Sequence, residues 1–338
     1  MTTPLREGSI TSTVDLDARG LRHGHLRLPH SSDESAWGVV AIPITVARGG
    51  EGPTALLTGG NHGDEYEGPL ALLDLARSLR AEELTGRVIV VPFMNHPAVL
   101  AGRRTSPLDG GNMNRAFPGH PDGTATQRIA DHFTRVLLPR ADLVLDIHSG
   151  GRTLDFVPLA ASHVLDDPEQ SRRCEAARDA FGAPWSLRMR EIDAAGMYDD
   201  TAEGLGKTFV TTELGGGGTS RPETLAIARR GLRNVLVHAG IVSGRVERSA
   251  SRRLVQPDDA CFHFAPEAGL IEHRVALGDT VERGDGIARI WDPHHCGRAP
   301  CEVMAQRDGV MVARHHPGLV RHGDCVAVLA VEEGIDPC

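Results

Sequence analysis

The sequence predicts an α/β protein in which helices cover a mixed sheet, followed by a smaller all-β unit. Short apolar strands alternate with helical stripes up to about residue 246, and short strands between Gly-Asp turns fill the rest. The length of 338 residues allows two domains. An apolar fraction of 40% and a charged fraction of 24% are typical of a globular chain.

Four apolar runs have the length and composition of buried strands: Thr54–Thr58, Arg87–Phe93, Leu143–Ile147 and Thr208–Thr212. Apolar residues at helical spacing lie between them, in the stripes Leu72/Leu73/Ala76/Leu79, Ile129/Phe133/Val136/Leu137 and Leu225/Ala228/Leu232/Val235/Leu236. Strands that alternate with helices indicate a largely parallel or mixed sheet covered on both faces. We therefore expect a first domain over residues 1–246, with an extension at about residues 1–45.

Residues 247–338 are expected to form a separate all-β unit. The stretches Glu272–Arg289 and Val303–Leu329 share a loose order of strand, Gly-Asp turn and strand, which predicts two similar halves. This unit resembles the biotinyl/lipoyl-like barrel-sandwich. A carrier of that kind needs a lysine in its hairpin turn, whereas Lys207, the only lysine, lies outside the unit. We expect a structural role, at the mouth of the active site or in an oligomer contact.

Charge, apolar runs and cysteines exclude several classes of protein. Acidic residues outnumber basic ones by 45 to 36, which argues against nucleic acid and anionic membranes as main partners. The longest apolar runs, such as Val39–Ala47, are far shorter than the roughly 18 residues of a membrane span. Met1–Gly20 lacks the apolar core of a secretory signal. Because six cysteines are too few for a disulfide scaffold, we expect reduced thiols in the cytoplasm.

Polar side chains at the ends of two predicted strands form a pattern typical of a metal site. His62 and Glu65 lie three residues apart in a glycine-rich segment after the strand 54–58, a spacing that can aim both at one point. His148 directly follows the strand 143–147, and the carboxyl ends of strands gather function in α/β sheets. Two histidines and one glutamate with an open fourth position are the ligands of hydrolytic zinc, so we expect one zinc ion per chain.

Two further sets of side chains have the chemistry of amide hydrolysis. Glu213 ends the strand 208–212 before four glycines, where its carboxylate could move a proton from water to a leaving amine. The polar loop before residue 116 holds three arginines suited to carboxylates and oxyanions: Arg103, Arg104 and Arg115. Taken singly, each element is also compatible with a polar turn, a hydrogen-bonded histidine, a helix cap or a solvated surface. His294, His295, Cys296 and Cys301 are either a second metal site or a surface loop.

Four segments together resemble the succinylglutamate desuccinylase/aspartoacylase family of zinc amidohydrolases, whose fold is carboxypeptidase A-like. They are Gly-Gly-Asn-His-Gly-Asp-Glu from residue 59, Asn-Met-Asn-Arg from 112, Asp-Ile-His-Ser-Gly-Gly from 146 and Thr-Glu-Leu-Gly from 212. The resemblance covers roughly residues 52–246. It implies that zinc binds to His62, Glu65 and His148, and that Glu213 acts first as general base and then as general acid.

The same resemblance implies how a substrate is held. Asn114 and Arg115 match the pair that binds its α-carboxylate, and an arginine shortly before them faces the oxyanion, with Arg104 favoured over Arg103. An aromatic side chain of the family also contacts the substrate, and Tyr198 is the candidate here. The expected partner is a small N-acyl amino acid, and a homo-oligomer such as a dimer stays open.

Within the family, the segments Ser35–Gly38 and Leu57–Pro69 resemble members that release acetate from N-α-acetyl-L-2,4-diaminobutyrate in ectoine degradation. Three alternatives stay open: another N-acyl amino acid deacylase such as a succinylglutamate desuccinylase or aspartoacylase, a carboxypeptidase, and a non-enzymatic zinc-containing binding module. The second amino group of diaminobutyrate needs an anion, for which Asp193, Asp199 and Asp200 are candidates.

Overall fold

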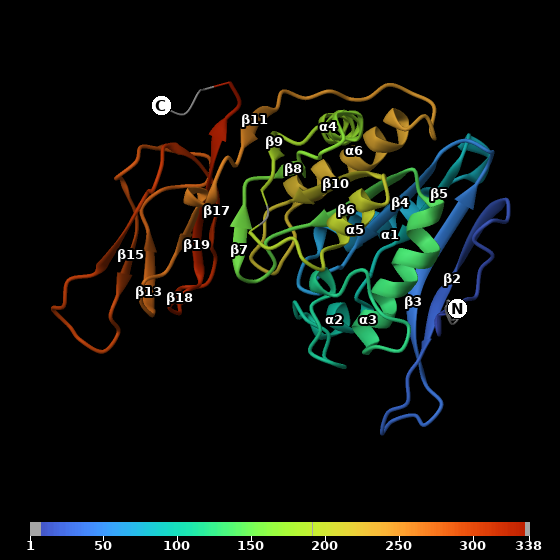
Figure 1. The fold of residues 1–338 in the computed structure, drawn as a ribbon, viewed down its shortest axis with the longest axis horizontal. Helices are drawn as coiled ribbons and strands as arrows, with labels where there is room; N and C mark the ends of the chain where they lie inside the picture. Colours follow the sequence, from blue (N-terminus) through green and yellow to red (C-terminus); the bar gives the residue numbers. More distant parts are fainter. Residues whose placement is uncertain (1–7, 191, 335–338) are drawn as a thin grey trace.

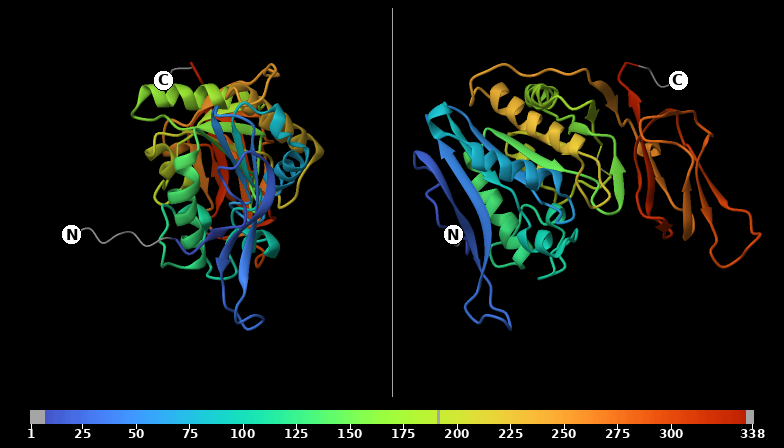
Figure 2. Two further views of the ribbon diagram at one scale, coloured as in Figure 1. Left: turned by 90° about the vertical axis from the view of Figure 1, so that its right-hand side faces the viewer. Right: turned by 180° about the vertical axis from the view of Figure 1, so that it is seen from behind.

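The computed structural model describes residues 8–190 and 192–334 (Figure 1). A large mixed sheet with helices on both faces forms the body of the molecule, and a four-stranded antiparallel sheet lies at its C-terminal end. Figure 2 shows that this end and the N-terminal hairpin lie on opposite sides of the molecule. None of the helices in the described part of the chain has the length and apolar character of a membrane span.

The centre of the large sheet consists of four parallel strands, in the order β5 (Arg87–Val91), β4 (Thr54–Gly59), β6 (Leu143–His148) and β10 (Thr208–Glu213). These are the four strands predicted from the sequence. The strand predicted over Arg87–Phe93 is β5, which ends at Val91. In the register of β6 and β10, His148 and Glu213 lie side by side. The parallel direction therefore brings their carboxyl ends to one edge.

Further strands extend the sheet on both sides of this centre. On the N-terminal side, β3 (Val39–Arg48) pairs with β5, and β2 (Gly20–Pro29) and β1 (Thr11–Ser12) follow. On the other side lie β8 (Leu159–Ser162), β9 (Trp185–Arg188), β11 (Arg252–Val255), β19 (Cys325–Glu332), β17 (Gly309–His315) and β14 (Thr280–Val281). The N-terminal extension is therefore part of the main sheet.

Helices bury both faces of the central strands because their side chains alternate between two apolar clusters. Leu57 and Leu145 face one cluster, under α1 (Glu67–Ser78), α4 (Pro168–Phe181) and α6 (Pro222–His238). Leu56 and Val144 face the other, under α3 (Ala125–His132), its π-helical continuation Phe133–Leu137, and α5 (Tyr198–Gly204). This alternation is what a period of two residues along a strand requires. Of the predicted helical stripes, Leu73 is the exception, because it lies exposed on α1.

The C-terminal unit is built of strands, and η5 (Asp259–Cys261) is the one helical turn among its described residues. Its second sheet has the order β16 (Cys301–Met304), β15 (Gly286–Trp291), β13 (Gly269–His273) and β18 (Leu319–Val320). This sheet packs against β17 and β19 across a common apolar cluster that includes Ile290 and Leu329. A two-sheet arrangement of this kind is what the sequence predicts.

Backbone ladders join the C-terminal unit to the rest of the molecule. Strand β11 pairs with β9 on one side and with β19 on the other, and β7 (Leu154–Phe156) pairs with β17. Residues 243–251, which contain the predicted boundary at 246/247, form neither helix nor strand. The division into domains 1–246 and 247–338 stays a prediction, since hydrogen-bonded strands cross between the two parts.

Candidate active site

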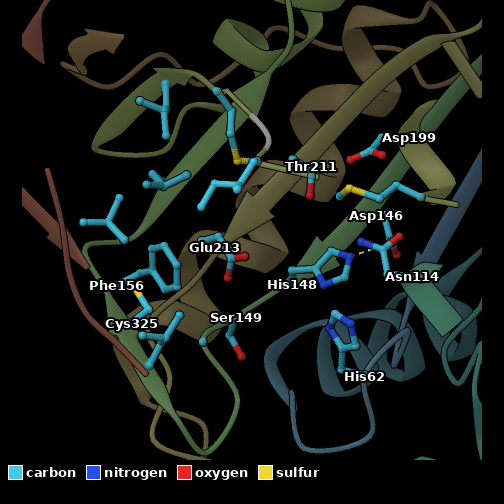
Figure 3. Close-up of a pocket in the computed structure, with 18 of the residues that line it drawn as sticks. His62, Asn114, Asp146, His148, Ser149, Phe156, Asp199, Thr211, Glu213 and Cys325 are labelled. Atoms are coloured by element: carbon cyan, nitrogen blue, oxygen red, sulfur yellow. Dashed lines mark hydrogen bonds and ion pairs between the residues drawn. The ribbon is translucent and has the colours of Figure 1, made fainter. Parts of the chain in front are cut away.

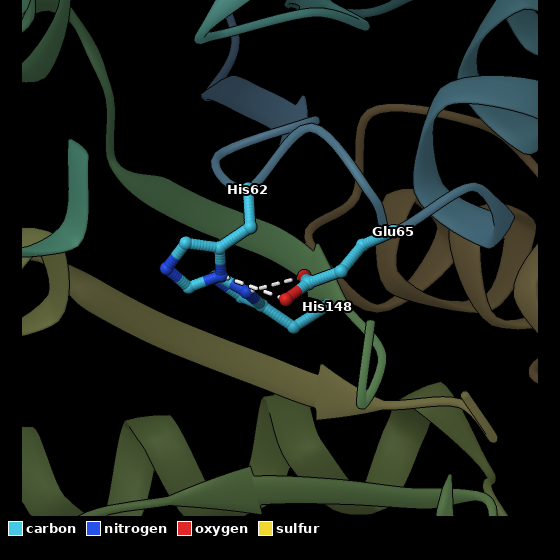
Figure 4. A group of neighbouring side chains, drawn as sticks. All are labelled: His62, Glu65 and His148. Carbon is cyan, nitrogen blue, oxygen red and sulfur yellow. Dashed lines mark hydrogen bonds and ion pairs between the residues drawn. The ribbon is translucent and has the colours of Figure 1, made fainter. Parts of the chain in front are cut away.

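Three predicted ligand residues meet at the carboxyl edge of the parallel strands (Figure 4). His62 and Glu65 lie in the turn between β4 and α1, and His148 is the last residue of β6. All three side chains are buried, and their potential ligand atoms lie within 4.8 Å of one another. The Nδ1 atom of His62 lies 2.7 Å from Oε1 of Glu65, and that of His148 lies 2.9 Å from Oε2.

Each histidine is oriented by a second partner behind it. The Nε2 atom of His62 donates to Oδ1 of Asn112 at 3.2 Å, and Nε2 of His148 donates to Oδ2 of Asp146 at 2.7 Å. In the tautomer in which Nε2 carries the proton, each Nδ1 atom has its lone pair directed toward the carboxylate of Glu65. Lone pairs from three side chains that converge in this way fit a metal cation held among them.

The electrostatics of this group also favour a positive charge. Burial disfavours the ionised form of Glu65, yet His62 and His148 outweigh it and hold the pKa of the carboxyl below its usual range. Burial lowers the pKa of His62. Burial acts on His148 in the same sense, but Asp146 and Glu65 raise its pKa well above the ordinary value. The three side chains therefore surround a position at which a cation is stabilised.

Asp146 is a site residue that sequence reasoning did not single out. It is 1% exposed, and besides His148 it accepts hydrogen bonds from Asn61 at 3.0 Å and from Thr58 at 2.7 Å. Three donors on one carboxylate fix its orientation and through it that of the imidazole. The signal was its place two residues before His148, because alternate residues of a strand share a face. Asn112, the first residue of the Asn-Met-Asn-Arg segment, is a second site residue that the sequence pattern does not single out.

Glu213 stands at the end of β10, half-buried, and lines a cavity of about 400 Å³ that also contains the metal-ligand group. Two different walls bound this cavity (Figure 3). On one side of Glu213 lie polar groups, including Asn114 and Asp199, and on the other lie apolar and sulfur-containing side chains, including Phe156 and Cys325. An amide bond beside Glu213 would thus have a polar and an apolar end.

The C-terminal unit supplies much of the apolar wall. Its lining residues are Phe262, Phe264, Val312, Cys325 and Val328. They join Phe156, Leu159 and Leu187 of the α/β part, which lie around strands β7 to β9. The unit therefore forms part of the wall of the cavity, and its role at the mouth of the active site stays a prediction. Its burial of Cys325 raises the pKa of that thiol to about 11, so the side chain acts as an apolar group at neutral pH.

The three predicted arginines differ in their position relative to the cavity. Arg104 lines the cavity, and its Nη1 atom lies 3.6 Å from Oε1 of Glu65. Arg103 is exposed and does not line the cavity; its backbone oxygen accepts from Gly63 at 3.0 Å. Arg115 lines the polar wall next to buried Asn114. The placement thus favours Arg104 for the oxyanion, and the role stays a prediction.

Tyr198 lines the cavity but is 1% exposed, at the start of α5. Its ring packs against those of Phe117, Phe133 and Phe209, with centroids 4.8, 5.9 and 5.4 Å away. Its backbone nitrogen donates to Oδ1 of Asn114 at 3.0 Å. These contacts show a supporting role beneath the polar wall, and a direct contact of the ring with substrate stays a prediction.

The histidine and cysteine cluster near residue 295 forms part of an exposed loop. His295 lies 2.7 Å from Asp292, and Cys296 is exposed. Within residues 8–190 and 192–334, the one group of three or more side chains at metal-ligand distances is that of His62, Glu65 and His148. The surface-loop interpretation therefore describes this segment.

Fold and site together define an amidohydrolase. The family model of the succinylglutamate desuccinylase/aspartoacylase catalytic domain matches residues 51–239. The chain belongs to this family.

Three relatives show how closely the chain resembles individual members. It is 57% identical over 327 residues, 96% of each chain, to the N-α-acetyl-L-2,4-diaminobutyric acid deacetylase of Halomonas elongata. The product-bound structure of the ectoine utilization protein EutE (DoeB) from Ruegeria pomeroyi superposes with a TM-score of 0.95, at 55% identity over 96% of this chain and 99% of that one. A succinylglutamate desuccinylase structure from Silicibacter has a TM-score of 0.94, at 54% identity over 97% and 100%.

Proposed function

We propose that the chain hydrolyses N-α-acetyl-L-2,4-diaminobutyrate to acetate and L-2,4-diaminobutyrate, with one zinc ion held by His62, Glu65 and His148. The observation that carries this proposal is the two-walled cavity, in which Glu213 lies between a polar and an apolar side. The deacetylase from Halomonas and the ectoine utilization protein support the choice of substrate. The reaction would belong to ectoine degradation.

Zinc suits the converging donor set, because two imidazoles and one carboxylate are a common ligand set of hydrolytic zinc. When bound, zinc supplies Lewis acidity, which polarises a carbonyl and acidifies a coordinated water. The residues around the ligands keep the set in place. Asp146 and Asn112 hold the two imidazole rings, and the backbone nitrogen of Ser149 donates to Oε2 of Glu65 at 3.3 Å.

Glu213 is the proposed proton carrier of the reaction. Its carboxylate takes the proton that the attacking water gives up as the oxygen bonds to the acetyl carbon. The amide bond then breaks, and the protonated carboxyl returns the proton to the departing α-amine. One side chain serves both steps because Glu213 lies between the two walls, within the cavity that contains the ligand group.

Arg104, Asn114 and Arg115 are proposed to hold the two anionic parts of the reacting molecule. Arg104 lies against the ligand group, where its guanidinium meets the negative charge that develops on the carbonyl oxygen. Arg115 and Asn114, on the polar wall, bind the α-carboxylate of the amino acid. A carboxylate bound there selects free amino acids over peptides that continue beyond that position.

The apolar wall favours an acetyl group over a succinyl group. A succinyl carboxylate on that side would need a cation, and among the described lining residues the remaining arginine is Arg190. Its Nε atom already lies 3.0 Å from Oδ1 of Asp259. An acetyl methyl group gains from burial beside Phe156 and Leu159, whereas a charged terminus loses its hydration there.

We also propose that the enzyme works in the cytoplasm on a small-molecule substrate. The five cysteines among the described residues form no disulfide bond, as expected in a reducing compartment.

The test is release of amine from four compounds by protein that carries one zinc per chain. They are N-α-acetyl-diaminobutyrate, its N-γ isomer, N-acetylaspartate and N-succinylglutamate, each with and without chelator. We expect chelator-sensitive cleavage of the first compound alone. Cleavage of another compound would support a zinc hydrolase with a different substrate. Tight zinc binding without cleavage of any compound would favour the non-enzymatic binding module.

A further inference from the structure

The proposed substrate carries a second amino group, which is positively charged at neutral pH. A cation that leaves water for a protein cavity requires a carboxylate or several oxygens in place of its hydration shell. Among the described residues, the carboxylates that line the cavity are Glu65, Asp146, Asp193, Asp199 and Glu213. We propose that Asp199 binds the side-chain ammonium and sets the preference for a cationic amino acid, an inference that rests on the proposed function.

Other contacts assign the remaining lining carboxylates to different tasks. Glu65 and Asp146 are bound to the two histidines of the ligand group. Glu213 is the proton carrier. The side chain of Asp193 is 65% exposed, and its Oδ2 atom lies 3.8 Å from Nε of Arg115, so it faces the proposed carboxylate-binding residue.

Asp199 combines burial with a place in the cavity. It is 5% exposed, lies in the first turn of α5, and accepts a hydrogen bond from the backbone nitrogen of Asp200 at 2.8 Å. Figure 3 shows its carboxylate on the same side of Glu213 as Asn114. Asp200, the next residue, is exposed and does not line the cavity. The structure thus separates the three aspartates that the sequence left equivalent.

Asp199 is held on the amino-acid side of the cavity by backbone contacts. The nitrogen of Tyr198 donates to Oδ1 of Asn114, and the oxygen of Gly196 accepts from Phe117 at 3.0 Å. Gly196 has a φ of +79°, and a Cβ there would lie 2.7 Å from the backbone oxygen of Arg115. The start of α5 is therefore packed directly on the Asn114–Arg115 pair that is proposed to hold the α-carboxylate.

The distances fit the length of the diaminobutyrate side chain. Thr211 and Glu213 point to the same side of β10 and lie two residues apart, which is about 7 Å along a strand. The second amino group is four bonds from the α-nitrogen, about 5 Å in an extended chain. With the α-nitrogen beside Glu213, the ammonium extends toward the level of Thr211, which lines the same cavity as Asp199.

The experiment compares two substrates that differ only in this amino group, N-α-acetyl-L-2,4-diaminobutyrate and N-acetyl-L-2-aminobutyrate. For the wild-type zinc enzyme we expect kcat/KM to be about 100-fold or more higher for the first, because a buried charge pair is lost with the second. Asp199→Asn should reduce this ratio to within a few-fold, mainly through KM. Asp200→Asn, a matched change one residue away, should keep the wild-type ratio.

Binding gives a second readout that does not depend on turnover. By calorimetry, L-2,4-diaminobutyrate should bind the wild type about 100-fold more tightly than L-2-aminobutyrate, and Asp199→Asn should remove the difference. Zinc content and the melting curve show whether that variant folds. Should it fail to fold, Asp199→Glu takes its place, since it keeps the charge but displaces it and should lower the ratio in part.

An unchanged substrate ratio in folded Asp199→Asn would overturn the inference while leaving the deacetylase function intact. Equal use of both substrates by the wild type would overturn it as well. Cleavage of neither substrate by the wild type would instead refute the proposed function, and the inference with it.

Discussion

The two halves of the active site differ in how the chain holds them. Glu65 and His148 are almost completely buried in or beside strands, with side chains 3% and 8% exposed. Arg104 and Arg115 come from the irregular segments around α2 (His96–Ala101) and η2 (Met113–Arg115), and their side chains are 48% and 39% exposed. One half is held by the sheet, and the other by loops that lie across it.

The difference indicates which residues do the chemistry and which hold the substrate. A buried ligand group with partners behind it keeps its geometry between reaction cycles, as a metal site requires. An exposed arginine loses side-chain entropy when it becomes ordered on a ligand, and this cost weakens its binding. Such arginines therefore suit a substrate that must be released after each reaction cycle. Removal of a ligand residue from the sheet-held half should therefore cost more activity than removal of an arginine from the loop-held half.

The largest effect is expected from removal of a ligand in the sheet-held half. His148→Ala takes away one of three converging donors and leaves the carboxylates of Glu65 and Asp146 without that imidazole. The variant should lose bound zinc and fall to background activity. Metal analysis after dialysis measures the first effect, and full zinc retention would place the third ligand elsewhere.

Glu213→Gln should separate chemistry from metal binding. The amide keeps the shape of the side chain but cannot accept and return the proton, so kcat should fall by about 10³-fold. Zinc content should stay at the wild-type level because Glu213 is not in the ligand group. Glu223→Gln, at an exposed position in the first turn of α6, is the matched control. Unchanged kcat in Glu213→Gln would remove this residue from the mechanism.

The two adjacent arginines test the loop-held half directly. Arg104→Ala should lower kcat by about 10²- to 10³-fold, the usual effect of losing one oxyanion donor. Arg103→Ala should change kcat by less than about twofold, as surface changes usually do, because Arg103 does not line the cavity. Steady-state kinetics of both variants on one substrate gives the comparison. The reverse order would assign the oxyanion to Arg103.

The smallest effect in the sheet-held half is expected for Asp146, which is hydrogen-bonded to the ligand residue His148. Asp146→Asn keeps the volume of the side chain but weakens its hydrogen bond to Nε2 of His148. Zinc affinity should fall by about 10- to 100-fold, with activity restored by excess zinc. Competition with a chelator of known affinity measures this change. Wild-type affinity would show that the imidazole is oriented without Asp146.

Much of the sheet-held half could be predicted from the sequence, because the signals for its residues lie next to them in the chain. His148 and Glu213 each directly follow a short segment rich in apolar and β-branched residues, and such a segment predicts both a strand and the end of that strand. His62 and Glu65 lie between a strand and a helix, where the turn must bring them to the sheet edge. The positions of these site residues can therefore be predicted from the residues next to them in the sequence.

The loop-held half and the cavity walls could not be predicted in this way. Nothing local distinguishes Arg103 from Arg104, or Asp199 from Asp200, since each pair is adjacent and equally polar. The apolar wall includes Phe262 and Val328, which come from a unit that the sequence marks as separate. His315, next to His316 in the sequence, is buried, and its ring contacts the backbone oxygens of Leu319 and Cys325.

By itself, the sequence determined the α/β class, the four central strands and the residues at their ends, because hydrophobic periodicity and strand termini are local properties of the chain. Which of two neighbouring side chains faces the cavity, and which faces water, follows from how distant segments pack together. The tertiary structure also decided that the C-terminal strands close the apolar wall. Those choices depend on contacts between segments far apart in the chain, such as the pairing of Asp155 with Arg314 in β7 and β17, and no local pattern records them.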